Sequence, residues 1–501
     1  MHSRLLNCCF LFALATVTNA ARAEVKLPTV LAAHMVIQRD KPVHVWGAAD
    51  AGEQVTVTFR GNHASTTASE IGRWSLYLPP GAAGGPFTLT VQGKNTITLN
   101  DVLVGDVWVA SGQSNMEFPM DPTMWSHGPF HAQQEIAAAN HPRLRLFHVE
   151  NTFADYPMDD VKATTWTPAT PESVLTFSAV GYFFGRDLLE KEQVPIGIVE
   201  ANWGGTPAEA WTSLKALSAD SSLMPVFAAR AGMMDPQAET LLKQKVEAKE
   251  VADAKAAGKT PPVFPWHPDP NPWAPAALFN GMIAPITPLP IRGVIWYQGE
   301  SNTDAMRAPI YGHLFETMIR DWRAQWAQGD FPFLYVQIAN FISPDEWATV
   351  REGQRKTLAL ANTGMAVTID IGNPDNVHPQ DKQSVGHRLA LWAEDLSYGA
   401  HVEDSGPLFR QAVPENGAMH IWFDHAASGL MAKGGELQGF EVAGPDGKFV
   451  IATAAISGED VIAKSASVAQ PMYVRYGWAS NPQCNLFNKA GLPASPFSSK
   501  N

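Results

Sequence analysis

Cysteine is scarce in this chain. Its 501 residues include three cysteines, and two of them, Cys8 and Cys9, lie within the first 23 residues. If those 23 residues are removed, Cys484 is the only cysteine left and no intramolecular disulfide can form. The sequence therefore excludes a small scaffold held together by disulfides.

Positive charge is also limited. Lys and Arg together number 36 against 49 Asp and Glu, which gives a formal net charge of −13, and the sequence contains no run of basic residues. Proteins bind nucleic acid and anionic membranes through clustered basic side chains. We therefore expect neither nucleic acid nor a membrane among the partners of this protein.

Long apolar runs are missing after the N-terminus, where no stretch approaches the ~18 residues of a membrane-spanning helix. The early apolar stretch, residues 5–17, follows Arg4 and leads to small residues that end at Ala23. This order is typical of a secretory signal peptide. We expect cleavage after Ala23, with Ala20 as the alternative, and a secreted or periplasmic, soluble protein. A large exported protein without disulfides favours a bacterial source.

The composition predicts a globular chain rich in turns and strands, with 45% hydrophobic residues, 39 Gly and 38 Pro. At ~100–200 residues per domain, a chain of this length should hold two to four domains. Short alternating runs separated by Gly and Pro indicate a small N-terminal β domain over residues 24–100. The clearest of these runs are residues 43–47, 55–59 and 87–91.

The middle of the chain has a different pattern. Apolar runs typical of buried strands alternate with helical patterns at residues 179–191 and 313–326. This alternation indicates an α/β domain with a mostly parallel sheet over residues 101–400. A Lys-, Glu- and Ala-rich helix at 239–259 and a Pro-rich stretch at 261–275 suggest an insertion at about 213–275. A C-terminal β domain is expected over 401–501. The apolar runs of the middle part are residues 102–110, 194–200, 293–296, 333–337 and 365–369.

Ser114 stands at the end of the first of these runs, in the sequence GQSNM. In a parallel sheet this position lies at the edge where ligands bind. A serine there either caps the next helix or acts as a nucleophile, and a nucleophile needs a nearby base and donors for the oxyanion.

The GQSNM run resembles the sialate O-acetylesterase family, a branch of the SGNH-type serine hydrolases. The resemblance covers most of the chain after residue 23. It implies a three-layer SGNH hydrolase core, a carbohydrate O-acetylesterase activity, and no metal or organic cofactor. The other matching runs are HMVIQR (34–39), VWG (45–47), QGESN (298–302), RY (475–476) and NLFNKAGLP (485–493).

Two further strand ends are candidates for the oxyanion hole. Gly204 and Gly205 follow the run that ends at residue 200, where they serve either a tight turn or close approach to a ligand. The resemblance implies that the N–H of Gly205 joins that of Ser114. It also implies a side-chain amide donor, assigned to Gln298 with Asn302 as the alternative.

The candidate base is His378, in a segment that also contains Asp375 three residues earlier. One loop could then supply both the base and the carboxylate that orients it. The arrangement resembles the Asp-x-x-His of SGNH hydrolases. Relatives place an acid two residues before the histidine, where this chain has Asn376, so Asp370 is kept as a substitute for the acid.

Other residues near these motifs are expected to contact substrate or to hold the loops together. Glu300 is assigned such a role because no second cluster of histidines or carboxylates at metal-ligand spacing accompanies it. A metal-dependent hydrolase that uses Glu300 and His378 is accordingly disfavoured. The full set is Gln113, Asn115, Trp203, Glu300 and Asn302.

The sequence thus predicts an exported serine esterase that removes acetyl groups from carbohydrate. Ser114 attacks, His378 accepts its proton, and Asp375 orients His378. The family name favours 9-O-acetyl sialic acid as the substrate. An acetyl xylan esterase is the first alternative, and a carbohydrate-binding protein without activity is the second.

Overall fold

The computed structural model describes residues 24–125, 127–234, 237–262, 264 and 269–500. The predicted signal peptide, residues 1–23, lies outside the described residues, as does part of the Pro-rich stretch at 261–275. Among the helices of the described part, none combines the length and the apolar character needed to cross a membrane.

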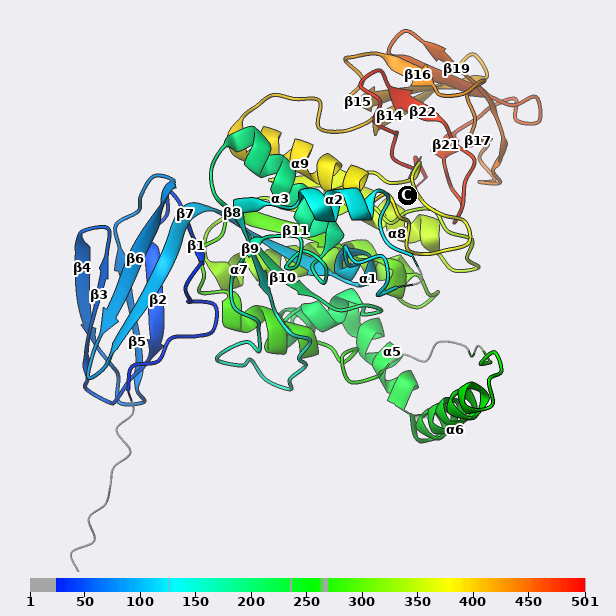
Figure 1. The fold of residues 1–501 in the computed structure, drawn as a ribbon. Coiled ribbons are helices and arrows are strands. Elements are labelled where there is room, and N and C mark those ends of the chain that lie inside the picture. Colours follow the sequence, from blue (N-terminus) through cyan, green and yellow to red (C-terminus); the bar gives the residue numbers. More distant parts are fainter. Residues whose placement is uncertain (1–23, 126, 235–236, 263, 265–268, 501) are drawn as a thin grey trace, which may run out of the picture.

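The N-terminal region is a small, mostly antiparallel β structure, seen in blue at the left of Figure 1, in which β1 pairs in parallel with β7 (Thr96–Gly112). Along β2, Val43 and Val45 are buried while His44 and Trp46 are not, which is the period-2 alternation of a half-buried strand. β3 pairs with β4 and β6, and β2 pairs with β5. The strands are β1 (Val36–Gln38), β2 (Val43–Ala48), β3 (Gln54–Phe59), β4 (Asn62–Thr67), β5 (Arg73–Leu78) and β6 (Gly84–Gln92).

One long strand, β7 (Thr96–Gly112), links this region to the central sheet. Its first part pairs antiparallel with β6, and its last part pairs in parallel with β10 (Ile196–Asn202) and β11 (Gly293–Tyr297). Residue 100, the predicted domain border, lies within β7. The strand that leads to Ser114 is therefore held by two parts of the molecule.

The central sheet has the order β13-β12-β11-β7-β10-β8-β9. All its pairs are parallel except β8 with β9, so the sheet is mixed. β10 and β11 are buried along their whole length, in keeping with the apolar residues 196–199 of β10 and 293–297 of β11. The predicted run at 365–369 forms a strand that begins and ends earlier. The remaining strands are β8 (His141–His148), β9 (Thr167–Ala169), β12 (Phe333–Val336) and β13 (Thr363–Ala366).

Helices cover both faces of this sheet (Figure 1). α3 (Ala179–Glu192) and α9 (Lys382–Tyr398) pack against each other on one face. α7 (Tyr311–Trp326) covers the other face, and α8 (Trp347–Thr357) packs against it. The glycines at 312 and 353 let α7 and α8 approach closely, because a Cβ on Gly312 would lie 3.0 Å from the Cα of Gly353.

The described part of the predicted insertion contains the α-helices α4, α5 and α6, of which α5 and α6 extend away from the core at the lower right of Figure 1. The Lys-, Glu- and Ala-rich stretch forms α6, as the composition predicts. Two short helices, α1 and α2, lie between β7 and β8 in the chain. The bounds are α1 (Ser114–Glu117), α2 (Ala132–Ala138), α4 (Leu214–Ser218), α5 (Met224–Met234) and α6 (Gln237–Ala256).

The C-terminal region is antiparallel and has a core of its own, which includes Ile421, Val461 and Phe497. Its sheets have the orders β14-β15-β20-β19, β18-β17-β21-β23 and β16-β22. The chain is thus a mixed α/β protein with additional antiparallel sheets at its C-terminal end. The strands are β14 (Leu408–Glu415), β15 (Ala418–Asp424), β16 (Leu430–Ala432), β17 (Phe440–Ala443), β18 (Val450–Ile451), β19 (Thr453–Ser457), β20 (Asp460–Lys464), β21 (Tyr473–Tyr476), β22 (Leu486–Asn488) and β23 (Phe497–Ser498).

Candidate active site

Three neighbouring strands end together at one edge of the central sheet. Gly112 at the end of β7 is paired with Asn202 of β10 on one side and with Tyr297 of β11 on the other. The loops that follow these strands therefore start side by side, as expected for the carboxyl ends of parallel strands. They carry the three motifs that sequence analysis selected around Ser114, Gly205 and Gln298.

Ser114 and His378 meet at this edge. The Oγ of Ser114 lies 2.9 Å from the Nε2 of His378, within hydrogen-bond distance. Gly112 permits the sharp turn before Ser114, because it has a φ of 139° and a Cβ there would lie 2.2 Å from the carbonyl oxygen of Tyr297. Both residues of the Ser114–His378 pair line one cavity of about 610 Å³.

The imidazole of His378 is surrounded by aromatic side chains. The ring of Trp125 meets it edge-on, with ring centroids 4.9 Å apart, and Phe118 lies on another side. Burial, with the positive charge of Lys382 and the neighbouring His127, lowers the pKa of His378 to about 4. At neutral pH the imidazole is therefore uncharged and able to accept a proton.

Asp375 does not hold His378. Its side chain is exposed, and in the described part of the chain its carboxylate makes no hydrogen bond or ion pair. The local reason is a turn in which Asn376 Oδ1 accepts the N–H of His378 at 2.8 Å, which leaves Asp375 on the outside. The substitute, Asp370, pairs instead with Arg388 through two bonds of 2.7 and 2.8 Å. The structure thus places neither predicted acid on His378.

The glycine loop after β10 lies against Ser114. A Cβ on Gly204 would be 3.3 Å from the Cβ of Ser114, and Gly205 has a φ of 72°, which favours glycine. The N–H of Gly204 donates to Glu117 Oε2 at 2.6 Å. The N–H of Gly205 makes no hydrogen bond to any residue that the structure describes. Gly205 thus remains available as a donor, while Gly204 is used to fix the loop.

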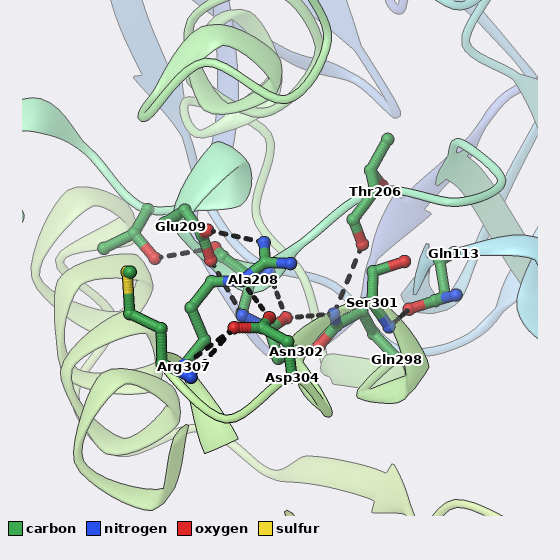
Figure 2. Close-up of polar contacts among 11 residues, drawn as sticks. Gln113, Thr206, Ala208, Glu209, Gln298, Ser301, Asn302, Asp304 and Arg307 are labelled. Carbon is green, nitrogen blue, oxygen red and sulfur yellow. Dashed lines mark hydrogen bonds and ion pairs between the residues drawn. The ribbon is translucent and has the colours of Figure 1, made fainter. Parts of the chain in front are cut away.

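Gln298 does not point into the cavity, contrary to its predicted role. Its side chain is fully buried, and its Nε2 donates to Thr206 O at 3.2 Å and to Asn302 Oδ1 at 2.7 Å (Figure 2). The alternative, Asn302, is also fully engaged, since its Nδ2 donates to Glu209 Oε2 at 2.9 Å and its Oδ1 accepts the N–H of Ala208. These amides join the loop after β11 to the loop after β10, because both side chains are buried and buried polar groups need hydrogen-bond partners.

The side chain of Asn115, the residue after Ser114, links three other segments of the chain through hydrogen bonds. Its Nδ2 donates to Glu300 Oε1 at 2.6 Å and to the carbonyl oxygen of Val377 at 2.9 Å, and its Oδ1 accepts from Lys382 Nζ at 2.5 Å. Burial raises the pKa of Glu300 and lowers that of Lys382 to about 7. Asn115 thereby connects the turns that carry Ser114 and His378 with the loop after β11.

The other two selected residues hold backbone in place. Gln113 is buried, and its Oε1 accepts the N–H of Ser301 at 3.2 Å, as Figure 2 shows, and that of Gly299 at 3.4 Å. Trp203 packs at the edge of the core, near Phe153, and does not line the cavity. Of the two, Gln113 lines the cavity and Trp203 does not.

Three residues near the pair, Glu117, Lys382 and Trp125, were not predicted from the sequence. Glu117 could have been found, since an acid three residues after the nucleophile lies on the same turn of helix. Lys382 and Trp125 carry no such signal, because their segments come to His378 only through the packing of the chain. Burial is the largest influence on the pKa values of Glu117 and Lys382. It raises the pKa of Glu117, although the hydrogen bond from the Gly204 N–H acts in the opposite direction.

The rest of the cavity is aromatic and acidic. Arg307 supplies the one Lys or Arg side chain among the described lining residues, and it is already paired with Glu209 at 3.1 Å and Asp304 at 2.6 Å. Its guanidinium lies 4.8 Å from the centroid of the Trp273 ring. Asp345 adds a further carboxylate to the lining. The cavity therefore offers a sugar aromatic surface and hydrogen-bond acceptors.

A potential metal-ligand group lies elsewhere. Among the described residues, Glu403, Asp404 and His425 have ligand atoms within 4.8 Å of one another, and neither Glu300 nor His378 belongs to such a group.

The arrangement around Ser114 is that of a hydroxyl beside an uncharged imidazole, next to an available backbone donor.

Comparison with known proteins gives consistent matches. Residues 266–393 match the family model described as a carbohydrate esterase, sialic acid-specific acetylesterase. Sialate O-acetylesterase from Rattus norvegicus is 28% identical, with 98% of this chain and 97% of the relative covered. The human protein is 27% identical over 92% and 90%, respectively. The crystal structure of a carbohydrate acetylesterase from Xanthomonas citri is 40% identical, covers 95% of this chain and 100% of its own, and has a TM-score of 0.81.

Proposed function

From the premise that this chain belongs to the sialate O-acetylesterase family and is a carbohydrate O-acetylesterase, we propose that Ser114 is its nucleophile and His378 its general base. The observation that carries the proposal is the 2.9 Å contact between Ser114 Oγ and His378 Nε2 inside the 610 Å³ cavity. We take the core that holds them to be a three-layer SGNH hydrolase, flanked by β domains over about residues 24–100 and 401–501, with β7 shared between the first of these domains and the core.

Acylation begins when Ser114 Oγ attacks the acetyl carbonyl carbon and His378 Nε2 takes the hydroxyl proton. The carbonyl oxygen gains negative charge and is stabilised by the N–H groups of Ser114 and Gly205. Collapse of this intermediate breaks the ester C–O bond, and His378 returns the proton to the sugar oxygen that leaves. The products of this step are a free sugar hydroxyl and acetyl-Ser114.

Deacylation repeats these steps with water. His378 removes a proton from a water molecule, which attacks the acetyl group, and the proton then goes to Ser114 Oγ as acetate leaves. Since no carboxylate contacts His378 among the described residues, its ring is oriented by packing against Trp125 and by the backbone bonds of its loop. The catalytic unit is therefore a Ser–His pair.

Two sugars are candidate substrates. The relatives are named as sialate O-acetylesterases, which makes 9-O-acetyl sialic acid the first. The charges of the cavity favour a second, neutral class such as acetylated xylan, because Arg307 is occupied by Glu209 and Asp304 and the carboxylate of a sialic acid meets Asp304 and Asp345 instead. From the predicted signal peptide we infer that the enzyme works in the periplasm or outside the cell.

The test is acetate release from 9-O-acetylated sialic acid and from acetylated xylan by the purified protein and by Ser114→Ala. We expect acetate from at least one substrate, xylan above sialate, and loss to background in the variant. A Ser301→Ala variant, which changes another serine that lines the cavity, is the matched control and should retain activity. Equal release by wild type and Ser114→Ala would refute the mechanism.

A further inference from the structure

Two adjoining cavities lie at the junction between the N-terminal β region and the central domain. The first has a volume of about 690 Å³ and the second about 600 Å³. Both are lined by His44 of β2 and by Pro288, which precedes β11. They form a groove with two compartments on either side of these residues. Ser114 follows the opposite, carboxyl ends of the strands, so this groove is separate from the active site.

Three aromatic rings run along the groove. His44 and Trp46 share one face of β2, and Tyr77 of β5 is the cross-strand partner of His44. The ring of His44 is stacked on Trp46, with centroids 4.9 Å apart, and on Tyr77, with centroids 4.3 Å apart. Trp46 lines the first cavity and Tyr77, which is 61% exposed, lines the second. Each compartment thus contains one outer ring of the stack, beside the largely buried rings of Trp74 in the first and Trp326 in the second.

The middle ring is fixed and uncharged. Nδ1 of His44 donates to the carbonyl oxygen of Pro288 at 2.8 Å, and Nε2 accepts from the hydroxyl of Ser75 at 2.7 Å. Burial lowers the pKa of His44, so the ring stays neutral at pH 7. The stack is therefore rigid before any ligand arrives, which reduces the entropy lost on binding.

Polar groups border the rings in both compartments. In the first cavity the positive charges of Lys26 and Arg73 are matched by Asp159 and Asp160, and Arg73 pairs with Asp159 at 2.6 Å. In the second cavity the rim includes the amide side chains of Gln325 and Gln328 and the ammonium group of Lys41. Rigid rings with amide and hydroxyl groups, and with charges that nearly balance over the two compartments, suit a ligand that has apolar faces, many hydroxyls and no net charge.

We propose that this groove binds a neutral polysaccharide, with one sugar ring in the compartment of Trp46 and another in that of Tyr77. The C–H face of a sugar packs on an aromatic ring, and its hydroxyls bond to the amide and carboxylate groups beside it. Carbohydrate is the substrate class of this enzyme, and the preference for a polymer rests on the proposed function. A polymer held here keeps its acetyl groups at high local concentration near the active site.

The test is native gel electrophoresis of the full chain through gels that contain soluble xylan or glucomannan from which the acetyl groups have been removed. We expect the wild type to be retarded, and Trp46→Ala and Tyr77→Ala to bind at least about fivefold more weakly, as for an aromatic residue central to an interface. Tyr77→Phe should bind like the wild type. Tyr156→Ala removes a tyrosine that is 74% exposed and lines neither cavity, and it should also leave binding unchanged.

Because these polymers carry no acetyl groups, the result is independent of whether the enzyme releases acetate from xylan. Hydrolysis of a small soluble acetyl ester and the melting temperature show that each variant is folded, and both should match the wild type for Tyr77→Ala. Lack of retardation of the wild type by both polymers would overturn the proposal. So would retardation of Tyr77→Ala equal to that of the wild type.

Discussion

The side-chain amide of Asn115 donates to the backbone carbonyl of Val377 at 2.9 Å. These residues follow the nucleophile and precede the base, respectively, and they are 262 positions apart in the chain. The bond therefore fixes the distance between Ser114 and His378 through the backbone. It does so without the carboxylate that usually orients the histidine of such a pair.

Replacement of Asn115 by alanine should lower both stability and activity. It removes bonds to Val377, Glu300 and Lys382 and leaves buried polar groups without partners, at a cost of about 1–3 kcal/mol for each. Urea unfolding and kcat on a small acetyl ester measure the two effects. Asn62→Ala, on the exposed edge of β4, is the matched control. A variant with wild-type kcat would show that the bond to Val377 does not position the pair.

Asp375→Asn should retain activity within about twofold, because an exposed carboxylate without a partner contributes little. In a Ser-His-Asp triad the same change costs about 10⁴-fold in kcat. Measurement of kcat on a small acetyl ester separates the two expectations. A loss of a hundredfold or more would restore Asp375 as the acid of a triad.

Glu117→Ala should lower kcat about tenfold with little change in KM, because the oxyanion loop loses the bond that fixes Gly204. This effect is weaker than the loss of an oxyanion donor itself, which lowers kcat about 10²–10³-fold. Glu117→Gln should recover most of the activity, since its amide oxygen also accepts the Gly204 N–H. If Glu117→Gln is as impaired as Glu117→Ala, the role of Glu117 is its charge and not the hydrogen bond.

The pH profile should show an unusually low acidic limit. The pKa of His378 is lowered to about 4, so kcat/KM should stay constant as the pH falls to about 5 and decrease once the imidazole takes up its proton near pH 4. Lys382→Met removes a positive charge that disfavours this protonation and should move the limit to higher pH. The move should be partial, because burial is the larger cause. A wild-type limit near pH 6.5 would contradict this.

The sequence alone predicted the elements that carry the site and much of their order. The buried strands β10 and β11 contain apolar runs at residues 196–199 and 293–297, and the half-buried β2 alternates, so local pattern and burial agree. The expected strand at 365–369 lies over residues 363–366 instead, because apolar residues such as Ile369 continue into the buried loop after β13. The border at residue 100 falls inside β7, because one strand can belong to two sheets, which a composition change cannot show.

For the site, sequence by itself determined that Ser114 and Gly205 each follow the end of a strand, and that His378 lies in a segment that also contains Asp375. Those features depend on apolar runs and short motifs, whereas the pairing of β7 with β10 comes from the structure. Only the tertiary structure decided which side chains complete the site: Gln298 and Asn302 turn inward to bond other loops, Asp375 faces solvent, and Glu117 and Lys382 come to lie beside the Ser114–His378 pair. The reason is physical. A side chain's role depends on which buried polar groups it must satisfy, and those partners come from segments far apart in the chain.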